Sequence, residues 1–383
     1  MTDLPIYLDY QATTPLDPRV LAQMMPYLTT KFGNPHSNHT FGWEAAAGVE
    51  IARKNIADLI AAEPEDIIFT SGATESNNLA IKGIAYAVYP SKNHIITTVT
   101  EHTCVLESCA TLERAGFDVT YLPVDSRGLI DLAQLDQAIT PKTSLVSIMA
   151  MNNEIGVIQN LKSIGKICKL KEVIFHTDAA QAVGKIPLDV SAMNINLMSI
   201  SGHKIYGPKG VGALYLRPKA NIQPLTLIDG GGQERGLRSG TLSPALCAGL
   251  GTACKIAKQD MAKDHDHIHH LAEKMKSTIF GSLENVKLNG SEEQRYPGNL
   301  NLIFDGVKGD ALIKELRNIS FSAGSACSTG RAEISHVLTA IGLDKTQAEC
   351  SVRIGIGRMT TDQEINYATN HIIDAVKKIR TRL

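Results

Sequence analysis

A phosphate-binding turn is the first chemical feature that the residues of this 383-residue chain suggest. The segment Ser71–Asn77 directly follows the apolar run Ile67–Thr70 and begins a helical pattern. Free N–H groups and the helix dipole at such a junction attract a phosphate, and the hydroxyl of Thr74 adds a donor. The same residues would also make an ordinary helix N-cap. Taken alone, the segment leaves both interpretations open.

Two further motifs place an acid and a lysine after apolar runs. Asp178 follows the run 173–175, where it could face a ligand or cap a helix. Lys204 follows the run 197–200 and precedes a Gly-Pro turn, so it could form a Schiff base or lie on the surface. A phosphate cradle, an acid for a ring nitrogen and a Schiff-base lysine are together the parts that hold pyridoxal 5′-phosphate (PLP).

A mainly parallel sheet covered by helices on both faces would bring these segments together. Short continuous apolar runs alternate with longer helical patterns, which is typical of that architecture. We predict strands at 67–70, 94–99, 119–123, 144–149, 173–177, 197–201 and 211–216. Helices are expected from 75 onward and at 104–114, 161–171 and 242–276.

Composition narrows the class of protein. The formal net charge is −1, which argues against wholesale binding to nucleic acid or to a membrane surface. The sequence holds no apolar run of the roughly 18 residues that span a bilayer, and residues 1–10 lack a signal region. The seven cysteines are scattered, without disulfide or zinc spacing, so we expect a cytoplasmic protein. His265 and His269 have metal-ligand spacing, but a solvated helix face explains them better.

The chain resembles the NifS/IscS-type cysteine desulfurases, which are class V aminotransferase-like PLP enzymes of fold-type I. The resemblance covers essentially the whole chain and rests on segments 7–15, 32–35, 69–77, 101–102, 152–156, 178–181, 201–204, 238–241, 325–327 and on Arg353. It implies an α/β fold with a mainly parallel seven-stranded sheet in a large PLP-binding domain, residues 15–260. A small α+β domain would comprise residues 1–14 and 261–383 and carry a catalytic loop at about 321–333.

The resemblance also implies a role for each matching residue. Lys204 would carry PLP, Asp178 would pair with its ring nitrogen, and His102 would stack on the ring and exchange protons. Gln181 would bond the phenolic oxygen, while Asn153 and Arg353 would bind the substrate, with Arg353 on its carboxylate. The remaining cofactor contacts would be Ala73, Thr74, Ser201 and His203, with Thr241 supplied by the other subunit of a homodimer.

Cys327 lies in a run of small residues, a composition typical of a mobile loop. A reachable thiolate there can act as a nucleophile, whereas most free cysteines simply pack as small hydrophobes. By position, Cys327 matches the family's catalytic cysteine, which takes sulfur from L-cysteine as a persulfide and leaves L-alanine. Cys104, two residues after His102, is the other thiol of interest. Arg331 is an unusual neighbour that would tune the thiolate or contact an acceptor.

The resemblance implies a protein sulfur acceptor, such as an iron–sulfur scaffold or a carrier for tRNA thiolation. Cys327 would then also be a transient 2Fe-2S ligand shared with a scaffold. Housekeeping members carry a further C-terminal tail that helps dock the scaffold, whereas this sequence ends at Leu383, so we expect the scaffold to be a less certain partner than the reaction itself. Selenocysteine lyase or another class V activity is the alternative reaction. A non-catalytic binding protein is disfavoured by the intact set of chemical residues.

Overall fold

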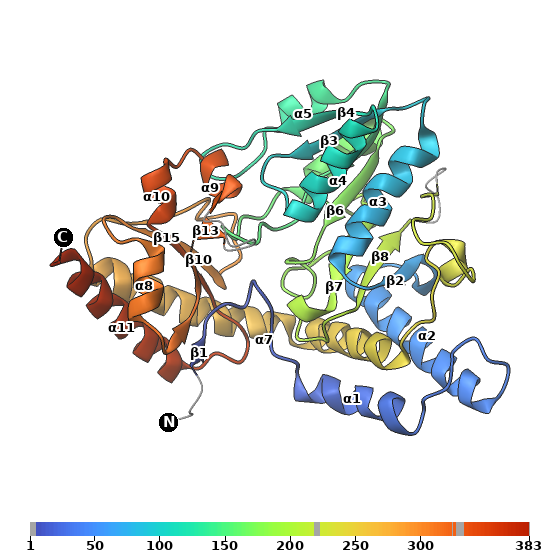
Figure 1. Ribbon diagram of the computed structural model, residues 1–383, viewed down its shortest axis with the longest axis horizontal. Helices are drawn as coiled ribbons and strands as arrows, with labels where there is room; N and C mark the ends of the chain where they lie inside the picture. Colours follow the sequence, from blue (N-terminus) through green and yellow to red (C-terminus); the bar gives the residue numbers. More distant parts are fainter. Residues whose placement is uncertain (1–4, 218–222, 324, 327–332, 383) are drawn as a thin grey trace.

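The computed structural model describes residues 5–217, 223–323, 325–326 and 333–382, and two sheets organise them. The larger has seven strands in the order β2-β8-β7-β6-β5-β3-β4 (Figure 1). Their bounds are β2 (Ile67–Thr70), β3 (His94–Thr98), β4 (Asp118–Leu122), β5 (Thr143–Ser147), β6 (Ile174–Asp178), β7 (Leu197–Ser201) and β8 (Gly212–Leu216). Only β8 among them runs antiparallel to its neighbours. The predicted mainly parallel seven-stranded sheet is therefore confirmed.

Helices cover both faces of this sheet. They are α1 (Pro18–Thr29), α2 (Thr40–Ile60), α3 (Ala73–Val88), α4 (Thr103–Arg114), α5 (Leu132–Ala138), α6 (Leu161–Leu170) and α7 (Pro244–Ser282), with short 3-10 turns η1 (Pro64–Asp66), η2 (Gly202–Lys204) and η3 (Glu234–Gly236). Successive strand residues point to opposite faces: Ile68 and Ile95 join the core under α3 and α4, while Phe69 and Ile96 join the core with α2 and α7. Burial on both sides explains why the strands are continuously apolar rather than alternating.

The second sheet is antiparallel and has the order β12-β15-β10-β9. Its strands are β9 (Val286–Leu288), β10 (Asn299–Phe304), β12 (Ser322–Ala323) and β15 (Ser351–Gly355), and its helices are α8 (Gly309–Glu315), α9 (His336–Ala340), α10 (Lys345–Glu349) and α11 (Asp362–Arg380). Two-residue strands form two further pairs, which are β1 (Ile6–Tyr7) with β11 (Ile319–Ser320) and β13 (Ser325–Ala326) with β14 (Glu333–Ile334).

Helix α7 connects the two sheets. It begins at the cap Ser243, packs against α1 and α2, and reaches α11 at its far end (Figure 1). Gly251 allows the close crossing with α2, because a Cβ there would lie 2.4 Å from the Cα of Ala52. One hydrophobic core cluster includes α7 residues on both sides of position 260, from Cys247 to Ile279. The expected domain boundary thus falls inside a continuous helix.

A buried ion pair ties the glycine-rich segment before α7 to the edge of the large sheet. The Arg53 guanidinium contacts the Glu234 carboxylate at 2.8 Å, and both side chains are buried. The same carboxylate accepts the backbone N–H of Phe69 in β2 at 2.6 Å. Across the described ranges, no helix is both long enough and apolar enough to cross a membrane.

Candidate active site

A cavity of about 690 Å³ opens at the carboxyl ends of the parallel strands. In an open α/β sheet this edge is where ligands bind. The cavity is lined by most of the residues that the sequence singled out, namely Ala73, Thr74, His102, Asn153, Asp178, Gln181, Ser201, His203, Lys204 and Arg353. Thr241 is exposed and does not line it. Cys327 and Arg331 lie outside the described residues.

Lys204 reaches the cavity from η2, directly after strand β7. Its Nζ donates to the carbonyl oxygens of Gln11 and Ala12, each at 2.7 Å. The pKa of the Lys204 amine falls from 10.5 to about 8, first because it is buried and second because the Arg353 cation is near. A larger share of the amine is therefore neutral, and so nucleophilic, than in an exposed lysine.

Asp178 ends strand β6 as a buried carboxylate with both oxygens engaged. Its Oδ1 accepts the N–H of Ala180 at 2.9 Å, and its Oδ2 accepts an N–H from the amide of Asn77 at 2.7 Å. These two donors fix the orientation of the carboxylate. The group can therefore face a cationic ring nitrogen in the cavity.

His102 is the N-cap of α4, and its position fixes its protonation pattern. Its Nδ1 accepts the backbone N–H of Cys104 at 3.2 Å, and the Cys104 Sγ lies 3.1 Å from the same nitrogen. Because Nδ1 accepts, the proton of the neutral ring sits on Nε2. Burial lowers the pKa of His102, with the nearby Asp178 carboxylate acting against that shift, so the ring is neutral near pH 7.

The turn before α3 has the features of an anion cradle. Gly72 is its N-cap at φ 153°, a conformation that L side chains rarely adopt, and no side chain caps the first N–H groups of the helix. Glu75 points elsewhere, because its carboxylate accepts the N–H of Ser71 at 2.7 Å and pairs with Arg238 at 2.9 Å. The free N–H groups thus remain available beside Thr74.

Three groups hold the Arg353 guanidinium beside the cavity. Its Nη2 donates to Asp9 at 2.8 Å and to Ser322 at 3.0 Å, while its Nη1 donates to the Asn153 carbonyl at 3.1 Å. Its Nε is buried and has no hydrogen-bond partner within the described part of the chain. A guanidinium positioned in this way suits a carboxylate ligand.

Comparison with known proteins agrees with this geometry. The Aminotransferase class-V family matches residues 6–367. Cysteine desulfurase IscS of Rickettsia bellii (strain OSU 85-389) is 58% identical over 378 residues, which are 98% of this chain and 92% of that protein. This chain belongs to the class-V aminotransferase family, among the NifS/IscS-type cysteine desulfurases.

Two solved structures have the same fold as this chain. A NifS-like protein superposes with a TM-score of 0.91 at 36% identity, covering 99% of this chain and all (100%) of that one. A structure described as SspA in complex with cysteine gives a TM-score of 0.82 at 40% identity, covering 93% of this chain and 100% of that one. The expected fold class of this desulfurase is thereby confirmed.

Sequence reasoning missed several residues that hold the desulfurase site together. Gln11 supplies the carbonyl that Lys204 contacts, Asn77 holds Asp178, and Asp9 with Ser322 holds Arg353. Gln11, Asn77 and Asp9 stand inside the segments that carried the resemblance, which was the available signal. Their partners are distant in sequence, so spacing alone could not have paired them.

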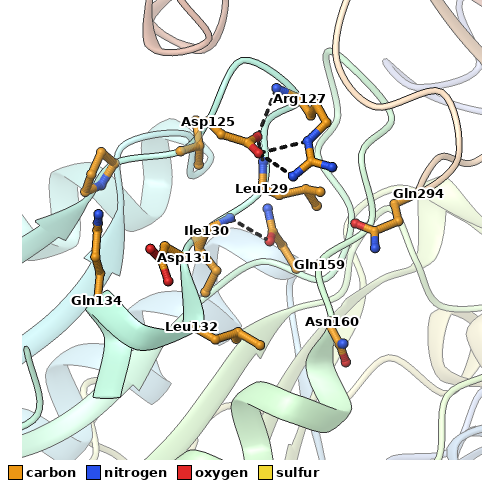
Figure 2. A pocket seen from close by; sticks show the side chains of 12 residues that line it. Asp125, Arg127, Leu129, Ile130, Asp131, Leu132, Gln134, Gln159, Asn160 and Gln294 are labelled. Carbon is orange, nitrogen blue, oxygen red and sulfur yellow. Dashed lines mark hydrogen bonds and ion pairs between the residues drawn. The ribbon is translucent and has the colours of Figure 1, made fainter. Parts of the chain in front are cut away.

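A second cavity, of about 480 Å³, lies between the connection that follows β4, the start of α6 and Gln294 (Figure 2). Two of its charged side chains form an ion pair, because the Asp125 carboxylate contacts the Arg127 guanidinium. The same carboxylate also accepts the backbone N–H of Leu129. Neither lysine, histidine nor cysteine is among its described lining residues. The Lys204 cavity, in contrast, brings together an amine, an imidazole and a guanidinium.

Proposed function

We propose that this cysteine desulfurase holds PLP in the Lys204 cavity, converts L-cysteine to L-alanine and leaves the sulfur as a persulfide on Cys327. The proposal rests on one observation: Lys204, Asp178 and Arg353 line the same cavity, at the carboxyl ends of the parallel strands. An amine, a carboxylate and a guanidinium there match the three needs of amino-acid chemistry on PLP, which are attachment, electron withdrawal and carboxylate binding.

The residues present fit the cofactor. The uncapped start of α3, with Thr74, Ser201 and His203, offers donors for a phosphate. His203 is held by its Nδ1 against the Thr13 hydroxyl at 3.0 Å, and burial lowers its pKa to about 4, so its ring stays neutral. Asp178 suits the ring nitrogen. When bound, PLP would supply an electron sink for negative charge at the substrate α-carbon.

The chain's own groups would perform the remaining steps. Arg353 and Asn153 bind the substrate carboxylate and orient the α-hydrogen. The neutral amine of Lys204 takes that proton as a base, and the Nε2–H of His102 is a proton donor in the same cavity. The Cys327 thiolate forms an S–S bond to the substrate sulfur as the carbon–sulfur bond breaks. The electron pair stays with carbon, which is protonated to give alanine, so the step needs no external reductant.

The test begins with purified protein and its visible absorption band near 420 nm, typical of lysine-bound PLP. Lys204→Ala should lose that band, and Cys327→Ala should lose alanine and sulfide production from L-cysteine with reductant present. Cys168→Ala is the matched control, because this buried thiol does not line the cavity, and the variant should retain the parent rate. Sulfide release by Cys327→Ala at the parent rate would refute the persulfide.

A homodimer is part of the proposal. Large apolar side chains are exposed around the end of α1 and the start of α2, namely Leu28, Phe32, Phe41, Trp43 and Ile51. Phe32 and Phe41 pack together at 5.3 Å between ring centroids, forming a preformed apolar surface. A second copy would cover this patch and contribute its Thr241 to the cofactor phosphate. Light scattering should give twice the 41.3 kDa chain mass, and Trp43→Glu should lower it.

The sulfur would pass in the cytoplasm to a protein acceptor, with iron–sulfur assembly as the first candidate pathway. Relatives named IscS support that choice. Trapping the Cys327 persulfide and identifying by mass spectrometry which protein removes its sulfur would test it. The large and small domains, divided near residue 260, would position the cofactor and the sulfur-carrying loop respectively.

A further inference from the structure

The Gln181 amide has two neighbours that together determine its orientation. Its Nε2 donates to the carbonyl oxygen of Gln11 at 2.8 Å, and its Oε1 accepts from the Nζ of Lys185 at 3.0 Å. A backbone carbonyl can only accept, and an ammonium group can only donate. Turning the amide over would set its oxygen against the Gln11 carbonyl oxygen, and would set its N–H groups against those of the protonated Lys185 amine. The contacts therefore fix which end of the amide faces which neighbour.

This orientation decides what Gln181 can offer to a ligand. Gln181 lines the cavity, whereas Lys185 does not, so the amide oxygen is directed away from the ligand space. One N–H of Nε2 is used by Gln11, and the other remains for the cavity. The Gln11 carbonyl also accepts from Lys204 at 2.7 Å, which links the amide to the reactive amine. The free group is thus a donor, suited to an anionic oxygen.

Within the described residues, Lys185 makes a hydrogen bond to Gln181 and a cation–π contact with Tyr296. Within the described ranges its Nζ forms no ion pair with a carboxylate, and its cation–π contact with Tyr296 is long, at 5.6 Å from the ring centroid. Burial, with the Lys204 and Arg353 cations, lowers the pKa of Lys185 to about 7. Either protonation state keeps N–H groups that can donate to Gln181. An apolar side chain would be cheaper to bury here, which points to a role other than stability.

We propose that Lys185 is a positioning residue that holds the Gln181 amide with its N–H toward the phenolic oxygen of PLP. The inference rests on the proposed function, since it concerns the cofactor placed in that cavity. A donor at the phenolic oxygen stabilises its anionic form and so lowers the pKa of the bound chromophore. Lys185 would exert this effect through Gln181 without touching the cofactor.

The experiment is a spectrophotometric pH titration of the resting holoenzyme, which is independent of turnover. Lys185→Met keeps the length of the side chain but removes its donors, and Lys185→Arg keeps donors and charge. We expect the chromophore midpoint of Lys185→Met to rise by about 0.5 to 1 pH unit, the scale of one hydrogen bond. Lys185→Arg should shift it by less. Circular dichroism of each variant checks that it is folded.

A double-mutant cycle separates positioning from direct charge effects. Gln181→Ala should raise the midpoint, and adding Lys185→Met to it should raise it no further. If the two shifts add in full, Lys185 acts by its own charge and the inference is wrong. If Lys185→Met titrates as the parent does while both hold the cofactor, the inference alone fails. If the parent never holds PLP, the proposed function fails together with it.

Discussion

Under the proposed function, the depressed pKa of Lys204 predicts how fast PLP attaches to this amine at each pH. With a pKa of about 8, about 10% of the amine is neutral at pH 7, compared with about 0.03% for a lysine of ordinary pKa 10.5. Only the neutral amine attacks an aldehyde. Attachment should therefore accelerate about tenfold per pH unit below 8 and level off above it, which makes it about 300-fold faster at pH 7 than with an ordinary lysine.

Arg353→Met tests the origin of this shift. The Arg353 cation disfavours a second positive charge at Lys204, so its removal should raise the midpoint by about one unit. Attachment at pH 7 should slow about tenfold, with little change above pH 10. Arg127→Met is the matched control, because Arg127 lies at the separate cavity in Figure 2 and pairs there with Asp125.

The assay is stopped-flow mixing of the apoprotein with PLP, following growth of the visible band from pH 6 to pH 11. A parent rate that still climbs tenfold per unit at pH 10 would show that burial does not depress the pKa of Lys204. An unchanged midpoint in Arg353→Met would show that burial alone produces the shift. A shift of equal size in Arg127→Met would refute the local electrostatic explanation.

Three further predictions concern the groups around the site. Asp9→Ala removes a hydrogen-bond acceptor of the Arg353 guanidinium, so the KM for L-cysteine should rise about tenfold while kcat stays within about twofold. Asp9→Asn should give an intermediate KM, and a fall in kcat alone would contradict this prediction. Glu234→Ala leaves the buried Arg53 guanidinium without its counter-ion and should lower the free energy of unfolding by about 3 kcal/mol in a urea titration. A decrease of less than about 1 kcal/mol would show that the pair behaves like a solvent-exposed ion pair. Burial raises the pKa of Cys104 from 9.0 to about 11, so at pH 7.5 iodoacetamide should label this thiol about 100-fold more slowly than an exposed thiol. Mass spectrometry measures the labelling, and a rate equal to that of an exposed thiol would contradict the raised pKa.

The large sheet was predictable because its signal is local. Each buried parallel strand is a short apolar run, and the run Leu197–Ser201 matches β7 residue for residue. The long helix after the glycine-rich segment extends to Ser282, six residues beyond the expected end, because Ile279 is buried against the second sheet's core. The antiparallel direction of β8 could not be predicted, because an apolar run in the sequence does not show which way the strand will run in the sheet.

The candidate site could be predicted from the sequence only where the type and position of a single residue indicate its chemistry. Lys204 and Asp178 stand at strand ends, where a reactive group is conspicuous. Gln11 contributes a backbone carbonyl, which any residue type carries, so its identity gave no hint of its contact with Lys204. Asn77 resembles an ordinary polar residue in a helix until its bond to Asp178, 101 positions away, is seen.

The pairing of Asp9 with Arg353 has a consequence for how the protein is made. The two residues are separated by 344 positions, and Asp9 also accepts from Ser322. During synthesis the start of the chain must wait until strand β15 has left the ribosome before this contact can form. The large sheet, complete at Leu216, can assemble well before that moment. Under the proposed function, a nascent chain would therefore form its cofactor-binding edge early, and it could bind the substrate carboxylate only after β15 has been synthesised.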